Sequence, residues 1–485
     1  MDTKKLRQKI LDLAIRGKLV PQDPNDEPAS VLLERIRAEK ERLIKEGKIK
    51  RSKKSASTDK AHYENPPLEI PESWCWTTLG ELCAIKGGKR LPKGKSFADI
   101  ITPHIYIRVT DMKDHTVLLS SLKYIDEDVF AEIKNYTISS NDLYLTIAGT
   151  IGDVGLVPAE LDGANLTENA AKLTDIKCSK QYLMYVLMSS IAQDHFCSRF
   201  HQVAQPKLSL ETASSTLIPL PPYREQLRIA EELDRWLGVV VSVEDDLSEL
   251  TNYVRKTKSK ILDLAISGKL VPQDPNDEPA IELLKRINPD FEPCDNSHYE
   301  NLPFEVPDGW CWAKINDVTE FIKNGAQIKQ FKGASGIPIT RIETISNSEL
   351  DMARMGYANI TNGAEYKDYY IKDGDILMSH INSRAHIGKC ALCNVGENQI
   401  IHGMNLLRIR CSKQILPEYM VYYFRSTTFY NLIEPHIKNA VNQASINITN
   451  LQKILIPIPP YSEQRRVAFI VDKLFSTIDT ITAEL

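Results

Sequence analysis

The chain has 485 residues, of which 42% are hydrophobic and 26% are charged, and its formal net charge is −4 at pH 7. This length predicts at least two domains, and no apolar run approaches the ~20 residues of a membrane-spanning helix, which excludes a membrane protein. The first twenty residues lack the continuous apolar core of a signal peptide, and nine scattered cysteines suggest no disulfide framework, so we expect free thiols and a cytoplasmic location.

Residues 1–60 form the first predicted segment, which is helical and basic. They contain 17 Lys or Arg against 10 Asp or Glu, and the excess ends in the run KIKRSKK at 48–54. Such a run is either a solvated linker or a contact to DNA phosphates, and the sequence leaves both open.

Residues 61–222 form the first module. Short runs rich in Val, Ile, Thr and Tyr, at 104–110 and 142–147, predict strands, and the amphipathic stretch 180–200 predicts a helix. We therefore expect an α+β module with a twisted sheet.

Residues 223–295 form a central helical segment. After the proline-rich boundary 219–222, apolar residues recur every three or four positions from Leu227 to Leu264, which predicts a helix with a coiled-coil-like seam. Gly268, Pro272 and Pro275 predict its end, so the helix would span 223–268 and reach ~70 Å at ~1.5 Å per residue. A further short helix is predicted at 280–287.

Residues 296–460 form the second module, and the remaining helix spans 461–485. Three near-duplicated stretches relate the two halves of the chain: 10–29 with 261–280, which differ only at Arg16 and Ser267, 62–76 with 298–312, and 218–230 with 456–468. The modules between these stretches diverge, although strands such as 405–410 and a helix at 416–433 are again expected. The last helix is cut short, and residues 1–30 carry its missing half. We therefore predict antiparallel helix pairs in a circular, pseudo-twofold arrangement.

These features resemble the specificity subunit of type I restriction-modification systems. The resemblance covers essentially the whole chain, and it is carried by the boundaries PLPPYREQ and PIPPYSEQ, the helix end KILDLAISGKLVPQDP, the module starts ESWCWTTLGEL and DGWCWAKINDV, and the internal NDLYLTIAGTIG and GDILMSHINSRAHIG. It implies two target-recognition domains, each reading half of a split, asymmetric double-stranded DNA sequence, while the helices set the distance between the half-sites.

The resemblance also implies partners and cofactors. Two modification methyltransferase subunits would dock on the helices, and restriction subunits that translocate and cut DNA would join them. The chain itself would bind no cofactor and would not be an enzyme, with S-adenosylmethionine, ATP and Mg²⁺ bound by the partner subunits. One alternative is a coiled-coil scaffold with two protein-binding modules, and another is a methyltransferase fused to its own recognition domain.

The absence of complete catalytic motifs argues against the fused enzyme. Residues 65–68 read Asn-Pro-Pro-Leu, in which Leu68 replaces the aromatic residue that would stack on a flipped adenine, and no glycine-rich cofactor loop follows a strand. Cys390 and Cys393, with His402 and Cys411 further on, have metal-ligand chemistry, but no second close pair follows them, so we expect free thiols.

Three loops per module have the residue types that contact DNA. Loop A spans 86–95 in the first module and 323–332 in the second. Loop B spans 146–150 and 379–386, and loop C spans 202–207 and 439–445. The candidate DNA-binding residues are Lys86, Lys89, Arg90, Lys93, Lys95, Thr146, Thr150, Gln205 and Lys207 in the first module, and Lys323, Gln327, Lys329, Lys332, Ser379, Asn382, Arg384, His386, Asn442 and Gln443 in the second. Glycines in loop A would leave room for the DNA, and Arg108 and Arg341 could instead be structural.

Overall fold

A computed structural model describes residues 2–47, 67–197, 206–294, 302–331, 336–346, 348–360, 363–440 and 443–484. The chain divides into two compact units, Met1–Leu247 and Ser248–Leu485. The basic run at 48–54 lies outside the described residues. None of the helices in the described ranges combines the length and the hydropathy that crossing a lipid bilayer requires.

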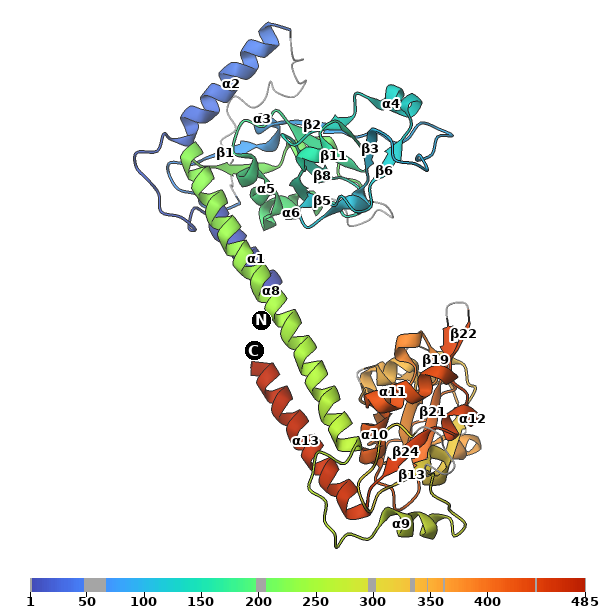
Figure 1. Cartoon of the computed structure of the whole chain (residues 1–485). Coiled ribbons are helices and arrows are strands. Elements are labelled where there is room, and N and C mark those ends of the chain that lie inside the picture. Colours follow the sequence, from blue (N-terminus) through green and yellow to red (C-terminus); the bar gives the residue numbers. More distant parts are fainter. Residues whose placement is uncertain are drawn as a thin grey trace. The chain divides into compact units, whose positions relative to one another are not determined.

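The long helix predicted between the modules is present. Helix α8 is continuous from Tyr223 to Ile266, a length of 44 residues (Figure 1). It ends two residues before Gly268, whose φ of +68° lets the amides of Gly268 and Lys269 bond back to the carbonyls of Ala265 and Leu264. This cap is favoured by glycine because a residue with a Cβ is strained at positive φ. The short helix α9 spans Ala280–Ile287, as predicted.

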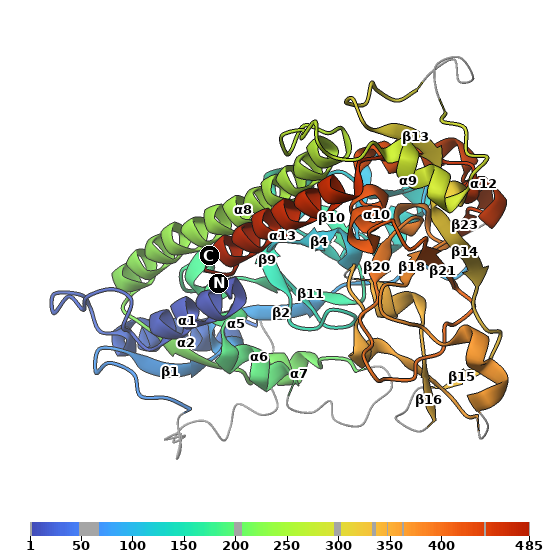
Figure 2. The same ribbon diagram turned by 90° about the horizontal axis from the view of Figure 1, so that it is seen from below.

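Each unit contains an antiparallel helix pair. In the first unit, α1 (Thr3–Ile15) packs along the beginning of α8, where Arg7 pairs with Glu244 at 2.6 Å, and the loop after α1 reaches back so that Gln22 bonds Glu225 at 2.7 Å. In the second unit, the end of α8 packs along α13 (Tyr461–Glu484), with Lys258 bonded to Asp479. Both pairings are visible in Figure 2.

The two units use equivalent parts of the sequence in these pairs. Residues 223–230 at the start of α8 match 461–468 in α13, and residues 10–15 of α1 match 261–266 at the end of α8. Each unit thus contains one copy of each half of the repeated helix. The predicted antiparallel helices are confirmed within each unit.

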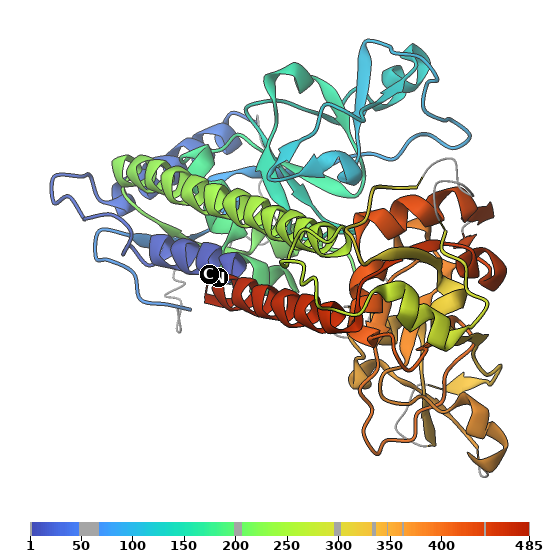
Figure 3. The same cartoon turned by 60° about the horizontal axis from the view of Figure 1, so that its bottom comes forward.

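A four-stranded sheet lies in each module and has the same topology in both. Figure 3 draws the strands of the first module in blue to green and those of the second in yellow to red. Its order is β2-β11-β8-β9 in the first module and β14-β21-β18-β20 in the second. The strands are β2 (Ala84–Gly87), β11 (Ala170–Thr174), β8 (Leu143–Thr146) and β9 (Val154–Leu156), and β14 (Thr319–Asn324), β21 (Leu406–Cys411), β18 (Ile376–Ser379) and β20 (Cys390–Leu392). The predicted α+β class with two repeated modules and long helices is confirmed.

A two-stranded ribbon fixes the start of each module to its end. Strand β1 (Cys75–Thr78) pairs with β12 (Leu217–Leu220), which places Trp76 opposite Pro219. Strand β13 (Cys311–Lys314) pairs with β24 (Leu455–Ile458), which places Trp312 opposite Pro457. The near-duplicated stretches at the module boundaries are therefore the two strands of one ribbon.

The peripheral parts of the modules differ. The first has the sheet β6-β3-β10-β7, formed by Lys123–Ile125, His104–Ile107, Ala164–Leu166 and Thr137–Ile138, and the helix α4 at Glu127–Ile133. The second has β15-β17-β16, formed by Gln330–Phe331, Gly356–Ala358 and Ile337–Ile339. Further helices and strands are α2 (Ala29–Lys45), α3 (Leu79–Leu82), β4 (Met112–Lys113), β5 (Thr116–Val117), α7 (Leu210–Ser214) and α12 (Ile448–Gln452).

The single helices predicted at 180–200 and 416–433 are each two helices. The first stretch forms α5 (Lys180–Met188) and α6 (Ser190–Cys197), and the second forms α10 (Pro417–Phe424) and α11 (Thr427–Ile433). A buried serine with extended backbone, Ser189 or Ser426, separates the helices, and its hydroxyl donates to the carbonyl three residues earlier. Local side-chain hydrogen bonds of this kind compete with helix continuation.

The core of each unit joins the helix pair to the module. In the first unit, Ile10 and Ile15 of α1 and Leu233 of α8 belong to the same buried cluster as Leu143 of the central sheet. In the second, Ile266 of α8 and Val467 of α13 share a cluster with Ile376. The position of each module on its helices is therefore fixed by apolar burial.

Candidate nucleic-acid interface

Loop A of the first module leaves the end of β2 and exposes its basic side chains. Lys86, Lys89, Arg90, Lys93 and Lys95 are all exposed. Several of them are also held by the module: the Lys89 ammonium lies 5.6 Å from the centre of the Tyr136 ring, Arg90 Nε donates to Glu168 at 2.6 Å, and Lys95 pairs with Asp128 at 2.5 Å. The loop thus presents cations from fixed positions, which suits contacts to phosphates.

The three loops of the first module meet at one short segment, residues 167–169, which we call the junction. From loop A, Arg90 binds the Glu168 carboxylate. The backbone amides of Ile147 and Ala148, next to Thr146 of loop B, donate to the carbonyl of Asn169 at 2.8 and 3.1 Å. Lys207 of loop C forms a β-bridge with Ala148, and its ammonium lies 3.5 Å from the Glu168 carbonyl. Loops predicted from separate parts of the sequence therefore lie side by side.

The second module brings its loops together in a related way. The amide of Ala326 in loop A donates to the His402 carbonyl at 2.7 Å, and Lys323, Gln327 and Lys329 are exposed. Loops B and C form the small sheet β19-β23-β22, made of Ile381–Asn382, Gln443–Ser445 and Lys438–Ala440. The exposed Arg384 of loop B donates to Asn439 of loop C at 2.9 Å and pairs with Glu434.

The remaining candidates fall into three groups. Thr150, His386 and Gln443 are exposed on loops B and C, and Asn382 is partly buried in β19. Gln205, Lys332 and Asn442 lie outside the described residues. Thr146 and Ser379 are buried.

The expectation that Thr146 and Ser379 face DNA needs correction. Their relative exposures are 0% and 1%. The Thr146 hydroxyl donates to the Thr150 carbonyl and accepts a hydrogen bond from the Asp153 amide at 2.9 Å. These two hydrogen bonds connect the two ends of loop B. The Ser379 hydroxyl accepts from Asn382 at 3.4 Å. These residues position the loop, and a pattern of polar residues in the sequence does not reveal which of them point inward.

Two of the loop A glycines have a structural role that the sequence did not predict. A Cβ added to Gly88 would lie 2.1 Å from the Thr167 carbonyl oxygen, and one added to Gly325 would lie 2.1 Å from the carbonyl oxygen of Gly403. These two glycines therefore allow loop A to approach the module's own backbone at the junction, which in the second module is the equivalent segment 403–405. This contact requires them whether or not DNA is present.

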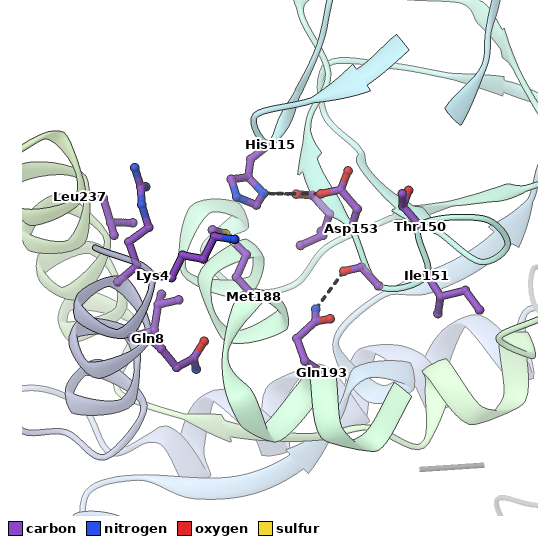
Figure 4. Close-up of a pocket in the computed structure, with 13 residues that line it drawn as sticks. Lys4, Gln8, His115, Thr150, Ile151, Asp153, Met188, Gln193 and Leu237 are labelled. Atoms are coloured by element: carbon purple, nitrogen blue, oxygen red, sulfur yellow. Dashed lines mark hydrogen bonds and ion pairs between the residues drawn. The ribbon is translucent and has the colours of Figure 1, made fainter. Parts of the chain in front are cut away.

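Loop B of the first module is supported from below, as Figure 4 shows. Gln193 of α6 donates to the carbonyl of Gly152 at 2.9 Å, and His115 lies 3.7 Å from Asp153. A cavity of about 430 Å³ separates this loop from Lys4 and Gln8 on α1. In the second unit, residues equivalent to the lining Leu237, Gln193 and Met188 are the larger Phe475, Tyr430 and Arg425.

The aspartate shared by both modules has a structural role. The carboxylate of Asp142 accepts a hydrogen bond from the Ser139 amide at 3.0 Å, and that of Asp375 accepts from the Lys372 amide at 2.9 Å. Both are buried just before a central strand, and Arg410 adds a two-pronged contact to Asp375. Arg108 is likewise structural, because it binds the buried Asp111.

Burial also determines which histidines carry charge. It lowers the pKa of His380 and of His402 to about 4, so both rings are neutral near pH 7. Arg384 supplies loop B of the second module with a positive charge that His380 does not provide. Among the residues that the structure describes, no three His, Cys, Asp or Glu side chains form a group that could hold a metal ion.

Sequence reasoning missed two exposed or partly exposed side chains at this surface, Glu168 and Met404. Each precedes an asparagine, Asn169 or Asn405, and leads into the middle strand of the module. The sequence contains a clue, because an asparagine follows the residue of interest in both modules. The two asparagines can be recognised as equivalent only after strand pairing has aligned the modules.

Comparison with known proteins places these features in context. The family model described as "Type I restriction modification DNA specificity domain" matches residues 71–248 and 307–485. The EcoAI specificity subunit of a type I restriction enzyme from Escherichia coli is 26% identical over an alignment that covers 99% of this chain and 90% of that protein. A putative type I specificity subunit, MjaX, from Methanocaldococcus jannaschii is 41% identical over 37% of this chain and 43% of its own length.

A solved structure has a similar fold. A chain from a structure of a type I restriction-modification system matches with a TM-score of 0.57 and 18% identity, covering 86% of this chain and 94% of that chain. At this identity the match supports the fold alone.

Proposed function

The chain belongs to the family of type I restriction-modification specificity subunits, and we propose from this membership that each of its two modules reads one half of a bipartite, asymmetric DNA sequence. The observation that carries the proposal is that in both modules loops A and B follow the two strands that flank the same middle strand, and loop C pairs with loop B. The residues on those loops nevertheless differ between the modules. A protein that recognises two different half-sites needs two modules with the same fold and different residues in contact with the bases.

The residues proposed to bind phosphates are the exposed lysines of loop A. Lys86 and Lys323 occupy equivalent positions, because each is paired in register with the central strand, opposite Lys172 or Arg408. A cation retained at the same place in both modules carries no sequence information and suits a contact to the backbone. The other exposed residues of loops A, B and C are proposed to contact bases or phosphates according to their chemistry.

The helix pairs are proposed to dock two modification methyltransferase subunits, with restriction subunits joining for cleavage. The support is the repetition itself: α8 and α13 begin with the similar sequences YREQLRIA and YSEQRRVA and expose the equivalent Tyr223 and Tyr461, at 49% and 40%. Two equivalent surfaces would bind two copies of one partner. S-adenosylmethionine, ATP and Mg²⁺ would then be bound by those partners, and the chain itself would recognise host DNA in the cytoplasm without catalysing a reaction.

The test is to express the chain with the modification subunit encoded beside it and to map methylated adenines in host DNA. We expect a split motif, and exchanging residues 77–218 for those of another such protein should alter one half of the motif and leave the other half unchanged. Methylation by this chain alone would contradict the proposal, as would a folded complex with no sequence preference.

A further inference from the structure

One pair of positions at the junction changes its chemistry completely between the two modules. Strand pairing aligns them without ambiguity: Lys172 lies opposite Lys86, and Arg408 lies opposite Lys323. The amide of Lys89 donates to the Leu166 carbonyl, and the amide of Ala326 donates to the His402 carbonyl. Counting from these shared bonds, Arg90 corresponds to Gln327, and Glu168 corresponds to Met404.

The surroundings of these positions are the same in both modules. Gly88 and Gly325, two residues before Arg90 and Gln327, approach the same carbonyl of the junction. Glu168 and Met404 each precede an asparagine. The backbone at the junction is thus conserved between the modules, while the side chains that it presents differ.

In the first module the two side chains form a charged unit. Arg90 Nε donates to Glu168 Oε1 at 2.6 Å, and their side chains are 78% and 24% exposed. Burial tends to raise the pKa of Glu168, but hydrogen bonds from Arg90 and from neighbouring groups lower it overall, so the carboxylate is ionised near pH 7. In the second module the equivalent residues are neutral, with Gln327 exposed and Met404 43% exposed.

The chemistry of the two pairs matches the edges of two different base pairs. In the major groove, guanine offers two acceptors that suit arginine, and cytosine offers an amino donor that suits glutamate. Adenine offers a donor and an acceptor that suit glutamine, and thymine offers a methyl group that suits an apolar side chain. Each module thus presents one residue suited to the purine and one suited to the pyrimidine.

We propose that these positions determine specificity: Arg90 with Glu168 reads a G·C pair in one half-site, and Gln327 with Met404 reads an A·T pair in the other. The inference rests on the proposed function and assigns it to named residues. It differs from a purely structural reading, in which Glu168 only holds Arg90 in place and a change at either residue weakens binding to every sequence equally.

The experiment exchanges the pairs in the full chain, expressed with its modification subunit. The variant Arg90→Gln with Glu168→Met should replace a G·C pair by an A·T pair in one half of the methylated motif. The variant Gln327→Arg with Met404→Glu should make the reverse change in the other half. In binding selections with the purified complex and randomised half-sites, preference at the affected base pair should shift by about tenfold to a hundredfold.

A matched control applies the same chemistry elsewhere. Arg35 and Glu27 form an exposed ion pair on and before α2, so Arg35→Gln with Glu27→Met removes the same charges away from the junction. This control should leave the motif unchanged. Thermal unfolding, monitored by circular dichroism, establishes that each exchanged variant is folded before its methylated motif is determined.

The outcomes separate this inference from the proposed function. If the wild-type complex gives no bipartite motif, the proposed function fails. If the wild type gives such a motif and folded exchange variants keep both halves unchanged, the function stands and this inference is overturned. Uniformly weaker binding without any change in base preference would also overturn it, since that result identifies the pair as structural.

Discussion

Arg228 on α8 donates to the buried carboxylate of Asp26 at 2.6 Å, although the two residues are 202 positions apart in the chain. Arg466 and Asp277 make the same contact at 2.6 Å in the second unit. Each pair fastens the loop QDPNDEP to the start of a helix, so the near-identical stretches of sequence correspond to one repeated tertiary contact.

Removing this contact should destabilise the unit that contains it. Asp26→Ala is expected to cost about 1–3 kcal/mol in the free energy of unfolding, because the aspartate is only 2% exposed and the arginine loses its buried partner. Urea denaturation measures the loss. Glu27→Ala is the control, since its exposed ion pair should contribute at most about 1 kcal/mol. Equal effects of the two substitutions would contradict the prediction.

Two buried glutamates should make stability depend on pH. Burial raises the pKa of Glu225 and of Glu463 above their ordinary value of 4.5, so the folded state favours the protonated form. The stabilisation from this is complete below pH 4.5 and is lost as the pH rises through the raised pKa. Replacing both residues by glutamine removes this loss.

Chemical denaturation in steps between pH 4.5 and pH 7.5 compares the two proteins. The unfolding free energy of the wild type should fall relative to that of the double variant as the pH rises. Parallel curves would show that the glutamates do not titrate differently in the folded state.

Loop A lies so close to the junction that a side chain at Gly88 or Gly325 should destabilise the protein. Gly88→Ala places a Cβ 2.1 Å from a backbone carbonyl oxygen that cannot move aside freely, so a loss of about 1–3 kcal/mol is expected. The neighbouring Gly87→Ala is a matched control, because its Cβ would lie 3.8 Å from Leu210. Gly325→Ala should reproduce the effect in the second unit, and a stable Gly88→Ala protein would contradict the assignment.

The hydroxyl of Thr146 should preorganise loop B. Thr146→Val keeps the shape of the side chain but leaves the Asp153 amide without the acceptor at 2.9 Å, so hydrogen exchange of residues 147–153 should become faster. Thr146→Ser keeps the hydroxyl and should restore slow exchange. Unchanged exchange in the valine variant would mean that the loop is held by other contacts.

Lys86 and Lys323 should contribute equally to DNA binding of any sequence. Replacing either lysine by alanine is expected to weaken DNA binding by the complex. The slope of the logarithm of affinity against the logarithm of salt concentration should become shallower by about 0.9, the value for one lost phosphate contact. Titrations at several salt concentrations measure this slope. Lys285→Ala removes an exposed lysine from α9 and should leave the slope unchanged. A change of base preference in the Lys86 variant would contradict a phosphate contact.

Much of the frame could be predicted because its signals are local. The apolar spacing after Pro222 and the glycine at 268 predicted α8 to within two residues of its end, and acidic residues and proline before 280 predicted α9. The break between α5 and α6 could not be predicted in this way, because a serine can also lie within a helix. In the structure, the Ser189 backbone is extended and its hydroxyl bonds to the Val186 carbonyl, which ends the first helix.

The sequence by itself determined that the chain contains two equivalent frames with different modules, because a repeat is visible without any knowledge of contacts. It also identified the loops that carry cations. Only the tertiary structure decided which residues of those loops face outward: Thr146 is buried, and Glu168, which lies outside the three predicted loops, binds Arg90 at the surface. The reason is physical, since the burial and the partners of a side chain depend on strand pairing between residues far apart in the chain, and residue type alone does not specify that pairing.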